Sequence, residues 1–387
     1  MEPILLTYLL TALGVWIYRS IRSLSELAQA PALRIPSGNI RKGSVTVLIP
    51  ARNEEKNIAA CVRSFLSQLR ESDEIIVINN GSTDRTEAIL KDLGAEEIKG
   101  SGTFFGTKKD SSDGPFLGYL NTPETPEGWT GKNYALHLGK DYAKGDWLLF
   151  TDADTRHEPG SVDAAIAFSE TNSLDLLTLL PRCLAHGFWE NLIQPCAMGY
   201  MGLWFPVRKI NDPESKVYFG NGQYLLLRHS HYRKLGCHHA VKEAFLEDFA
   251  LMRKTKETGA KGICAFGMNL YGTRMYDSFE TLWRGWRRIY LHAFEQNPAD
   301  LLRCVLSTFL FSVLPFAILP FCFGNSLAGI LATGLAFIIW ITAFKTHTIV
   351  KANPVSALFH PLAAAVFTLI LADALKMAAL KHPTHWR

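Results

Sequence analysis

Two carboxylates one residue apart, Asp152 and Asp154, are the residues whose types and spacing point most directly to chemistry. They follow the apolar run Trp147 to Phe150, which predicts a short buried strand. Because strand side chains alternate with a period of two, both carboxylates leave the strand on the same side. Paired carboxylate oxygens suit Mg²⁺ or Mn²⁺, which keep other positions for water and phosphate. The alternative is a helix N-cap, because Asp favours that position and Pro159 follows closely.

The elements that would position these carboxylates come earlier in the chain. Val45 to Ile49 and Ile75 to Ile78 predict strands, and each is followed by apolar residues at helical spacing. This order predicts an α/β fold with a mainly parallel sheet flanked by helices, in which ligands bind at the carboxyl ends of the strands. The chain contains neither G-x-G-x-x-G nor a P-loop sequence, which argues against a dinucleotide dehydrogenase and a P-loop NTPase.

Gly131 and Lys132 open a further predicted helix, within the string from Gly128 to Leu136. A lysine and amide N–H groups at a helix N-terminus suit a diphosphate. The alternative for Lys132 is an ordinary solvated lysine. Residues 94–127, which precede this string, are rich in Gly, Ser, Thr, Pro and charge and predict a loop or a short edge strand.

Three motifs in this order resemble the family-2 glycosyltransferases, which have the GT-A fold: Pro50-Ala51-Arg52-Asn53-Glu54, Asn80-Gly81-Ser82-Thr83-Asp84 and Asp152-Ala153-Asp154. The resemblance implies a nucleotide sugar, with a UDP-sugar expected, and Mg²⁺ or Mn²⁺ on Asp152 and Asp154. The donor would contact Ala51, Arg52, Glu54, Asn80, Asp84, Lys132 and Asp152. The family commonly has an Asp pair where this chain has Asn79 and Asn80. An amide donates and accepts, so it can still read a pyrimidine edge.

A second group of motifs is similar to the membrane-bound, carotenoid- and hopanoid-type branch of this family. It comprises Asn221-Gly-Gln223, the string Leu235 to Val241 and Glu247-Asp248. The resemblance thus covers roughly residues 45–295, adds Asn221 and Gln223 to the donor site, and implies that Asp248 is the catalytic base with Glu247 as its neighbour. An ionised carboxylate can take the proton of an acceptor hydroxyl, and two adjacent acids repel so that one pKa rises. The alternative is a solvated helix start, where the dipole favours acids.

Apolar runs near both ends of the sequence predict membrane segments. Pro3 to Tyr18 carries no charge and is followed by Arg19 and Arg22, which predicts an anchor running from outside to cytoplasm. A signal peptide would carry its positive charges before the apolar run. Val305 to Phe323 and Leu327 to Phe344 predict a transmembrane hairpin. Val355 to Ala372 predicts either a third full span or a re-entrant or interfacial segment. A full span would place the basic residues Lys376, Lys381 and Arg387 outside, against the charge rule.

Two aromatic segments allow more than one interpretation. Phe188 to Val207 either lies along the membrane interface or forms a buried core helix. Thr281 to Arg288 holds Arg287, which either closes over the donor diphosphate or, with its neighbours, lies among lipid headgroups. Processive polysaccharide synthases carry Q-x-x-R-W in this place, and the chain lacks it.

Composition narrows the class of protein further. The 387 residues carry a net charge of +4 and no Lys/Arg-rich arm, which gives no indication of nucleic-acid binding. The seven cysteines include no C-x-x-C pair, which favours free thiols in a reducing compartment. We expect an anchor (1–22), a linker (23–43), a GT-A domain (44–300) and a C-terminal membrane domain of two to three helices (301–387).

The predicted function is metal-dependent, inverting transfer of a sugar from a nucleotide sugar to a lipid or isoprenoid-type hydroxyl. The predicted location is the cytoplasmic membrane, with the catalytic domain in the cytoplasm. The alternatives are a processive polysaccharide synthase and a non-catalytic membrane scaffold with the same fold. A solute transporter is poorly served by so large a polar domain.

Overall fold

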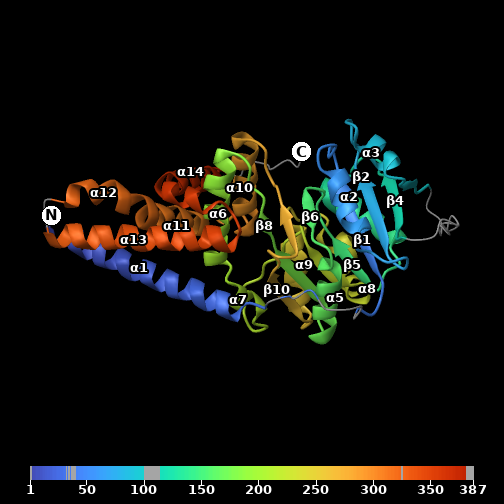
Figure 1. Ribbon diagram of the computed structural model, residues 1–387, viewed down its shortest axis with the longest axis horizontal. Helices are drawn as coiled ribbons and strands as arrows, with labels where there is room; N and C mark the ends of the chain where they lie inside the picture. Colours follow the sequence, from blue (N-terminus) through green and yellow to red (C-terminus); the bar gives the residue numbers. More distant parts are fainter. Residues whose placement is uncertain are drawn as a thin grey trace. The chain divides into compact units, whose positions relative to one another are not determined.

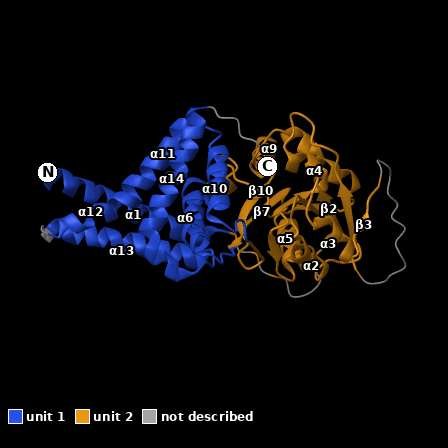
Figure 2. Ribbon diagram, turned by 90° about the horizontal axis from the view of Figure 1, so that it is seen from above, with its two compact units in different colours: residues 1–30, 183–208, 274–385 blue, residues 31–182, 209–273, 386–387 orange. Residues whose placement is uncertain are grey.

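The structure is a computed structural model that describes residues 2–31, 33, 35, 41–99, 114–323 and 326–380. The chain folds into two compact units that are interleaved in sequence (Figure 2). Unit 1 comprises residues 1–30, 183–208 and 274–385, and unit 2 comprises residues 31–182, 209–273 and 386–387. Pro36, Gly38, Lys381, Arg387 and much of the predicted 94–127 loop lie outside the described residues.

Unit 2 is built on an eight-stranded sheet with the order β10-β7-β9-β5-β1-β2-β4-β3 (Figure 1). Neighbouring strands are parallel except at β9, which runs antiparallel to both β5 and β7. The predicted α/β fold with a mixed, mainly parallel sheet is therefore confirmed. The strands are β1 (Val45–Ala51), β2 (Glu74–Asn79), β3 (Glu96–Glu97), β4 (Phe116–Asn121), β5 (Trp147–Phe150), β7 (Leu176–Leu180), β9 (Leu225–Arg228) and β10 (Gly262–Phe266).

Helices pack on this sheet through the apolar positions that the sequence pattern indicated. The first helix of unit 2 is fully buried at Ile58, Cys61, Val62 and Phe65. Outside the main sheet, β6 (Thr155–His157) pairs antiparallel with β11 (Tyr271–Thr273), and β8 is Arg182–Cys183. The helices are α2 (Ile58–Leu66), α3 (Thr86–Asp92), α4 (Gly131–Gly139), α5 (Ser161–Thr171), α8 (His229–Lys234) and α9 (Glu247–Glu257), with short turns at Lys140–Tyr142 and Cys237–Val241.

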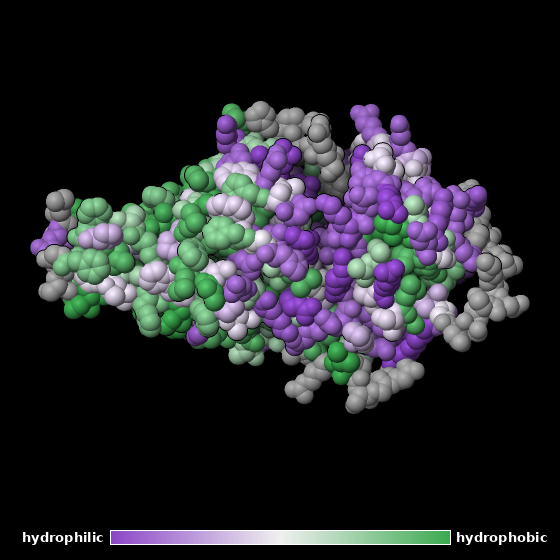
Figure 3. Space-filling model, turned by 45° about the horizontal axis from the view of Figure 1, so that its top comes forward, coloured by the Kyte–Doolittle hydropathy of each residue, from purple (hydrophilic) through white to green (hydrophobic). Residues whose placement is uncertain are grey.

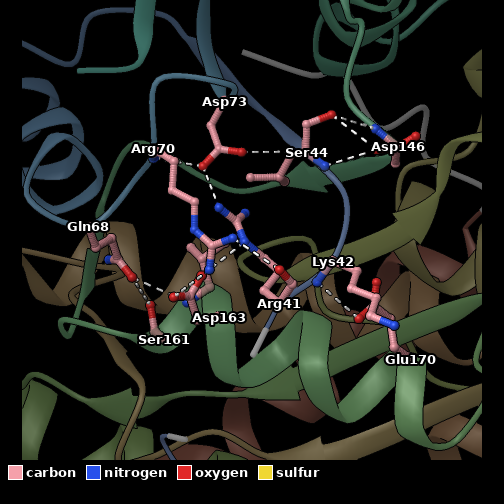
Figure 4. Close-up of polar contacts among 12 residues, drawn as sticks. Arg41, Lys42, Ser44, Gln68, Arg70, Asp73, Asp146, Ser161, Asp163 and Glu170 are labelled. Atoms are coloured by element: carbon pink, nitrogen blue, oxygen red, sulfur yellow. Dashed lines mark hydrogen bonds and ion pairs between the residues drawn. The ribbon is translucent and has the colours of Figure 1, made fainter. Parts of the chain in front are cut away.

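A buried polar network ties the amino ends of β1 and β2 to α5 (Figure 4). Arg41 Nη2 lies 2.5 Å from Asp73 Oδ2, and Arg41 Nε lies 3.0 Å from Asp163 Oδ1. Asp73 also accepts a hydrogen bond from the Val45 amide at 3.0 Å. These groups fix the start of β1, so its opposite, carboxyl end is left free to carry ligand contacts.

Unit 1 is helical, and its described residues include four helices long and apolar enough to cross a membrane: Glu2–Gln29, Pro298–Cys322, Leu327–Ile349 and Pro354–Ala379. Apolar side chains gather on the visible surface over these helices (Figure 3). The elements are α1 (Glu2–Gln29), α6 (Phe188–Trp204), α10 (Phe279–Ala293), α11 (Pro298–Thr308), a π-helical turn (Phe309–Val313), α12 (Leu314–Cys322), α13 (Ser326–Ile349), a 3₁₀ turn (Pro354–Phe359) and α14 (His360–Ala379), with α7 (Val207–Asn211) where the chain passes between units.

Two predicted segments differ from the structure in detail. The first helix continues to Gln29, beyond the expected anchor boundary at residue 22, because Leu24 and Leu27 prolong its apolar pattern and Pro31 follows only after it. Residues 188–204 form a continuous helix within unit 1, and Leu192, Ile193 and Ala197 are buried there. For this segment the structure favours the buried core helix over the interfacial one.

Candidate active site

Asp152 and Asp154 lie directly beyond the carboxyl end of β5, the central strand of the mixed sheet. The N-cap alternative is wrong, because strand β6 follows Asp154 and α5 begins only at Ser161. The hydroxyl of Thr155 donates to the Asp152 carbonyl at 2.7 Å, which fixes the backbone between the two carboxylates. The pair therefore stands at the edge of the sheet where ligands bind in folds of this class.

Lys132 brings two of the predicted site motifs together. Its Nζ lies 2.7 Å from Asp152 Oδ1 and 2.8 Å from Glu247 Oε1, and only 15% of its side chain is exposed. Burial alone would lower the pKa of this ammonium, but the charges of Asp152, Glu247 and Asp248 outweigh burial and raise it. Lys132 is thus a buried cation between two acidic groups, and the interpretation as an ordinary solvated lysine is wrong.

The helix that carries Lys132 is anchored by residues that sequence reasoning did not select. Thr130 caps α4 by accepting from the Asn133 amide. The Asn133 side-chain amide lies within 2.8–3.1 Å of the carbonyls of Val241, Lys242 and Ala244. Asn133 therefore fastens the start of α4 to the loop that leads to the acid pair. Its position next to Lys132 was the only sequence signal for this role.

Glu247 and Asp248 form the first turn of α9 and are 5% and 9% exposed. The interpretation as a solvated helix start is wrong for both. Asp248 Oδ2 accepts from the Gly222 amide at 2.6 Å, and Oδ1 accepts from the Phe249 amide at 2.8 Å. Burial raises the pKa of Asp248, the charge of Glu247 raises it further, and Lys132 offsets part of the effect.

Two glycines make room for this arrangement. A Cβ on Gly222 would lie 2.7 Å from Lys132 Nζ and 3.0 Å from Glu247 Oε1. A Cβ on Gly220 would lie 2.1 Å from the Asp248 carbonyl oxygen. Asn221, between the two glycines, donates to the Leu179 carbonyl at 2.9 Å. The carbonyl of Gln223, which follows them, accepts from Thr151 at 2.8 Å. The Asn-Gly-Gln turn therefore packs directly against the acid pair and the end of β5.

The loops after β1 and β2 are joined to each other by hydrogen bonds. The Asn80 amide donates to the Ala51 carbonyl at 2.8 Å, and Asp84 Oδ2 accepts from the Glu55 amide at 3.0 Å. Asn80 is also engaged through its side chain, which donates to the Gly131 carbonyl at 3.1 Å and accepts from Thr122 at 2.9 Å. Both polar atoms of this side chain, predicted to read a base, are thus bonded within the chain.

The remaining predicted donor residues have different surroundings. Arg52 is exposed, whereas Glu54 is partly buried and accepts from the Asn57 side chain at 2.9 Å. Arg287 belongs to unit 1, where its Nη1 lies 3.0 Å from Asp373 Oδ2. Trp283 donates to the same carboxylate oxygen at 2.8 Å. Arg287 therefore has an anionic partner within its own unit, on α14.

The two carboxylates after β5 fit a hard divalent cation. Within the described ranges no three His, Cys, Asp or Glu side chains converge as a complete metal-ligand set. Mg²⁺ and Mn²⁺ need only one or two carboxylates when a diphosphate and water supply the other ligands. Asp154 Oδ1 is buried without a hydrogen-bond partner in the described structure. Burial and then the charges of Asp152 and Glu54 raise the Asp154 pKa, so a cation here would relieve an unfavourable charge.

Comparison with known proteins identifies the class. Residues 46–104 and 124–233 match the model of glycosyl transferase family 2. Over these residues the chain is similar to the family 2 glycosyltransferases, so the resemblance that the sequence motifs indicated is confirmed. A mannosyltransferase from Pyrobaculum calidifontis, solved in complex with GDP-Man and Mn²⁺, has a similar fold, with a TM-score of 0.52, 16% identity and coverage of 97% of this chain and 98% of that chain.

Relatives with similar sequence include 4,4'-diaponeurosporenoate glycosyltransferases. The chain is 27% identical to the enzyme of Staphylococcus haemolyticus over 250 residues, which cover 63% of this chain and 60% of that protein. It is 26% identical to the enzyme of Staphylococcus aureus strain MRSA252 over 265 residues, which cover 66% of this chain and 63% of that protein. The chain thus spans less than two thirds of the length of these curated relatives.

Proposed function

We propose that this chain is a membrane-anchored glycosyltransferase that transfers a sugar from a nucleotide sugar, expected to be a UDP-sugar, to a lipid or isoprenoid-type hydroxyl. The observation that carries the proposal is the contact of Lys132 with both Asp152 and Glu247. It joins a group suited to a metal and a diphosphate to a buried acid pair suited to activating an acceptor. The carotenoid named by the relatives supports an apolar acceptor.

The donor site is assigned to the carboxyl ends of β1, β2 and β5. Lys132 and the first amides of α4 would hold the diphosphate by charge and by hydrogen bonds. Asp152 and Asp154 would hold Mg²⁺ or Mn²⁺, which supplies a Lewis acid that offsets the charge developing on the leaving diphosphate. The proposed donor contacts are Ala51, Arg52, Glu54, Asn80, Asp84, Asn221 and Gln223.

The acceptor is assigned to the acid pair. Asp248 would accept the proton of the acceptor hydroxyl. At the same time the hydroxyl oxygen would bond to the anomeric carbon of the sugar, and the bond from that carbon to the diphosphate would break. Attack opposite the leaving group inverts the anomeric configuration. The amides of Gly222 and Phe249 orient the Asp248 carboxylate, and Glu247 keeps its basicity high.

The membrane context supports a lipid acceptor. We assign the apolar helices of unit 1, beginning with Glu2–Gln29, to the membrane and unit 2 to catalysis on the cytoplasmic side of the inner membrane. A processive polysaccharide synthase is less well supported, because Q-x-x-R-W is absent from the sequence. A non-catalytic scaffold would have no need of the charged contacts that Lys132 makes with Asp152 and with the buried Glu247.

The direct test uses full-length protein in native-like membranes with labelled nucleotide sugars and extracted cellular lipid. Asp152→Asn is expected to lower transfer roughly 10²- to 10³-fold through lost electrostatic stabilisation. Asp248→Asn is expected to lower it roughly 10²- to 10⁴-fold through loss of the base. Asp92→Asn, an exposed change at the end of α3, is the matched control and should transfer normally. Near-normal transfer by either site variant would remove that residue from its proposed role.

A further inference from the structure

Lys132 occupies a position at which it must interact with any cation bound by Asp152. Its ammonium lies 2.7 Å from Asp152 Oδ1, the carboxylate assigned to the metal. The same ammonium lies 2.8 Å from Glu247 Oε1, on the acceptor side of the site. A divalent ion on Asp152 would therefore lie only a few ångströms from a fixed positive charge, and the two cations would repel each other.

The helix start that carries this ammonium is anchored on several sides. Its helix is fixed at the start by Thr130, by the three contacts of Asn133 and by the Asn80 side chain on the Gly131 carbonyl. The missing side chain of Gly222 leaves space for the ammonium, because a Cβ there would lie 2.7 Å from Nζ. The backbone therefore places Lys132 beside Asp152, and two ion pairs hold its ammonium there. A metal bound by Asp152 would meet this positive charge.

A diphosphate changes this balance. It brings negative charge that is shared by the lysine and the metal, so each cation gains a partner other than Asp152. The metal then no longer competes with Lys132 for a single carboxylate. By thermodynamic reciprocity, if the diphosphate strengthens metal binding, the metal strengthens diphosphate binding by the same factor.

We infer that Lys132 makes metal binding at Asp152 conditional on the donor diphosphate, so that the metal enters together with the nucleotide. This inference rests on the function proposed above. It assigns Lys132 two opposite effects: it weakens the binding of the metal alone and strengthens the binding of the metal with a nucleotide diphosphate. A lysine that served only as a diphosphate contact would have no effect on the metal alone.

The test measures the Mn²⁺ affinity of the detergent-solubilised full chain by electron paramagnetic resonance of free Mn²⁺, without nucleotide and with UDP or GDP. Lys132→Gln is expected to bind Mn²⁺ alone roughly tenfold or more tightly than the wild type, since one nearby positive charge is removed. The same variant is expected to lose most of the strengthening that the nucleotide gives to the wild type. Lys132→Arg keeps the charge and should resemble the wild type.

Two further variants make the result specific. Lys140→Gln removes a charge just beyond α4, where Lys140 pairs with Asp141, and should leave Mn²⁺ affinity unchanged. The double variant Lys132→Gln, Asp152→Asn should lose the tighter binding. Thermal melting of each variant checks that it is folded.

Each remaining outcome overturns a defined statement. Equal Mn²⁺ affinity of wild type and Lys132→Gln without nucleotide, with Mn²⁺ bound by both when nucleotide is present, would refute the conditional binding and leave the proposed metal site intact. Tight binding that survives in the double variant would place the ion elsewhere and refute the inference. Failure of every protein to bind Mn²⁺, even with nucleotide, would refute the metal site of the proposed function together with the inference.

Discussion

At the scale of single residues, the site concentrates negative charge around one lysine. Asp152 and Glu247 share Lys132, whereas Asp248 accepts hydrogen bonds from the backbone amides of Gly222 and Phe249. Amide donors stabilise a carboxylate less than a cation does. Burial and the charge of Glu247 therefore raise the pKa of Asp248 despite its two amide donors. A carboxylate with a raised pKa is a stronger base than an exposed aspartate, which suits proton transfer from a hydroxyl.

The pH profile of transfer follows from this shift. The base form of Asp248 exists above its pKa, so kcat/KM should fall as pH drops through that raised pKa, well above the ordinary value of 3.8. The profile of the wild type, measured at saturating Mn²⁺, should therefore show an acidic limb that is missing from Asp248→Asn. Asp92→Asn should keep the limb. An unchanged limb in Asp248→Asn would mean that another group titrates.

The residues that the sequence identified are those whose type alone is informative. Acid pairs and a glycine-lysine pair at a helix start have a chemical meaning before any fold is known. Asn133 and Gly222 lack such a meaning, because an asparagine in a helix and a glycine in a turn are ordinary. Their roles depend on which loop crosses them in space, and that contact joins residues about 90 to 110 positions apart. Asn80 shows the reverse case, since its type suggested base reading while its side chain is bonded to Gly131 and Thr122.

At the scale of elements, the turn before β9 and the first turn of α9 are fitted together at one glycine. The absent side chain of Gly220 lets the turn approach the Asp248 carbonyl, where a Cβ would stand at 2.1 Å. In the sequence, the turn precedes α8 and α9 follows it, so the two elements meet only when the chain folds. The direction in which Asp248 points thus depends on a contact between backbones.

Gly220→Ala should therefore impair transfer while the chain still folds. The added methyl group must push α9 or the turn aside by an ångström or more, and a misplacement of about 1 Å can cost roughly 10²-fold in rate. The matched control is Gly114→Ala, because a Cβ at Gly114 meets nothing within 4 Å. Transfer assays and thermal melts of both proteins check the expectation. Equal activity of the two variants would show that the site tolerates displacement of α9.

Individual elements were more predictable than their order in the sheet. The strands β1, β2 and β5 were recognisable because buried strands read as continuous apolar runs. The antiparallel insertion of β9 between β5 and β7 was not predictable, because strand pairing depends on distant partners that local pattern does not identify. The return of residues 183–208 to unit 1 had the same cause, since an apolar helix can pack in either unit.

At the scale of the whole molecule, the chain passes between units several times. Unit 1 collects residues 1–30, 183–208 and 274–385, and all four apolar helices that could cross a membrane belong to it. The last of them, Pro354–Ala379, is 26 residues long with a mean hydropathy of 2.0, enough for a full span. Asp373 within it is paired with Arg287 and bonded to Trp283, which lowers the cost of placing a carboxylate near the membrane.

A full span by α14 has a consequence for topology. Starting from a cytoplasmic unit 2, the helices 298–322, 327–349 and 354–379 cross three times, so a tag after residue 387 should lie on the opposite side from unit 2. A second tag between Pro213 and Glu214, both exposed in unit 2, should lie in the cytoplasm. Protease treatment of inside-out vesicles should remove only the internal tag, and treatment of right-side-out vesicles only the terminal one.

Both tags removed from inside-out vesicles would mean that α14 enters the membrane without crossing it, in keeping with the positive charge of Lys376. Removal of the internal tag from right-side-out vesicles would contradict a cytoplasmic catalytic domain, because a nucleotide-sugar site would then face away from the cytoplasm.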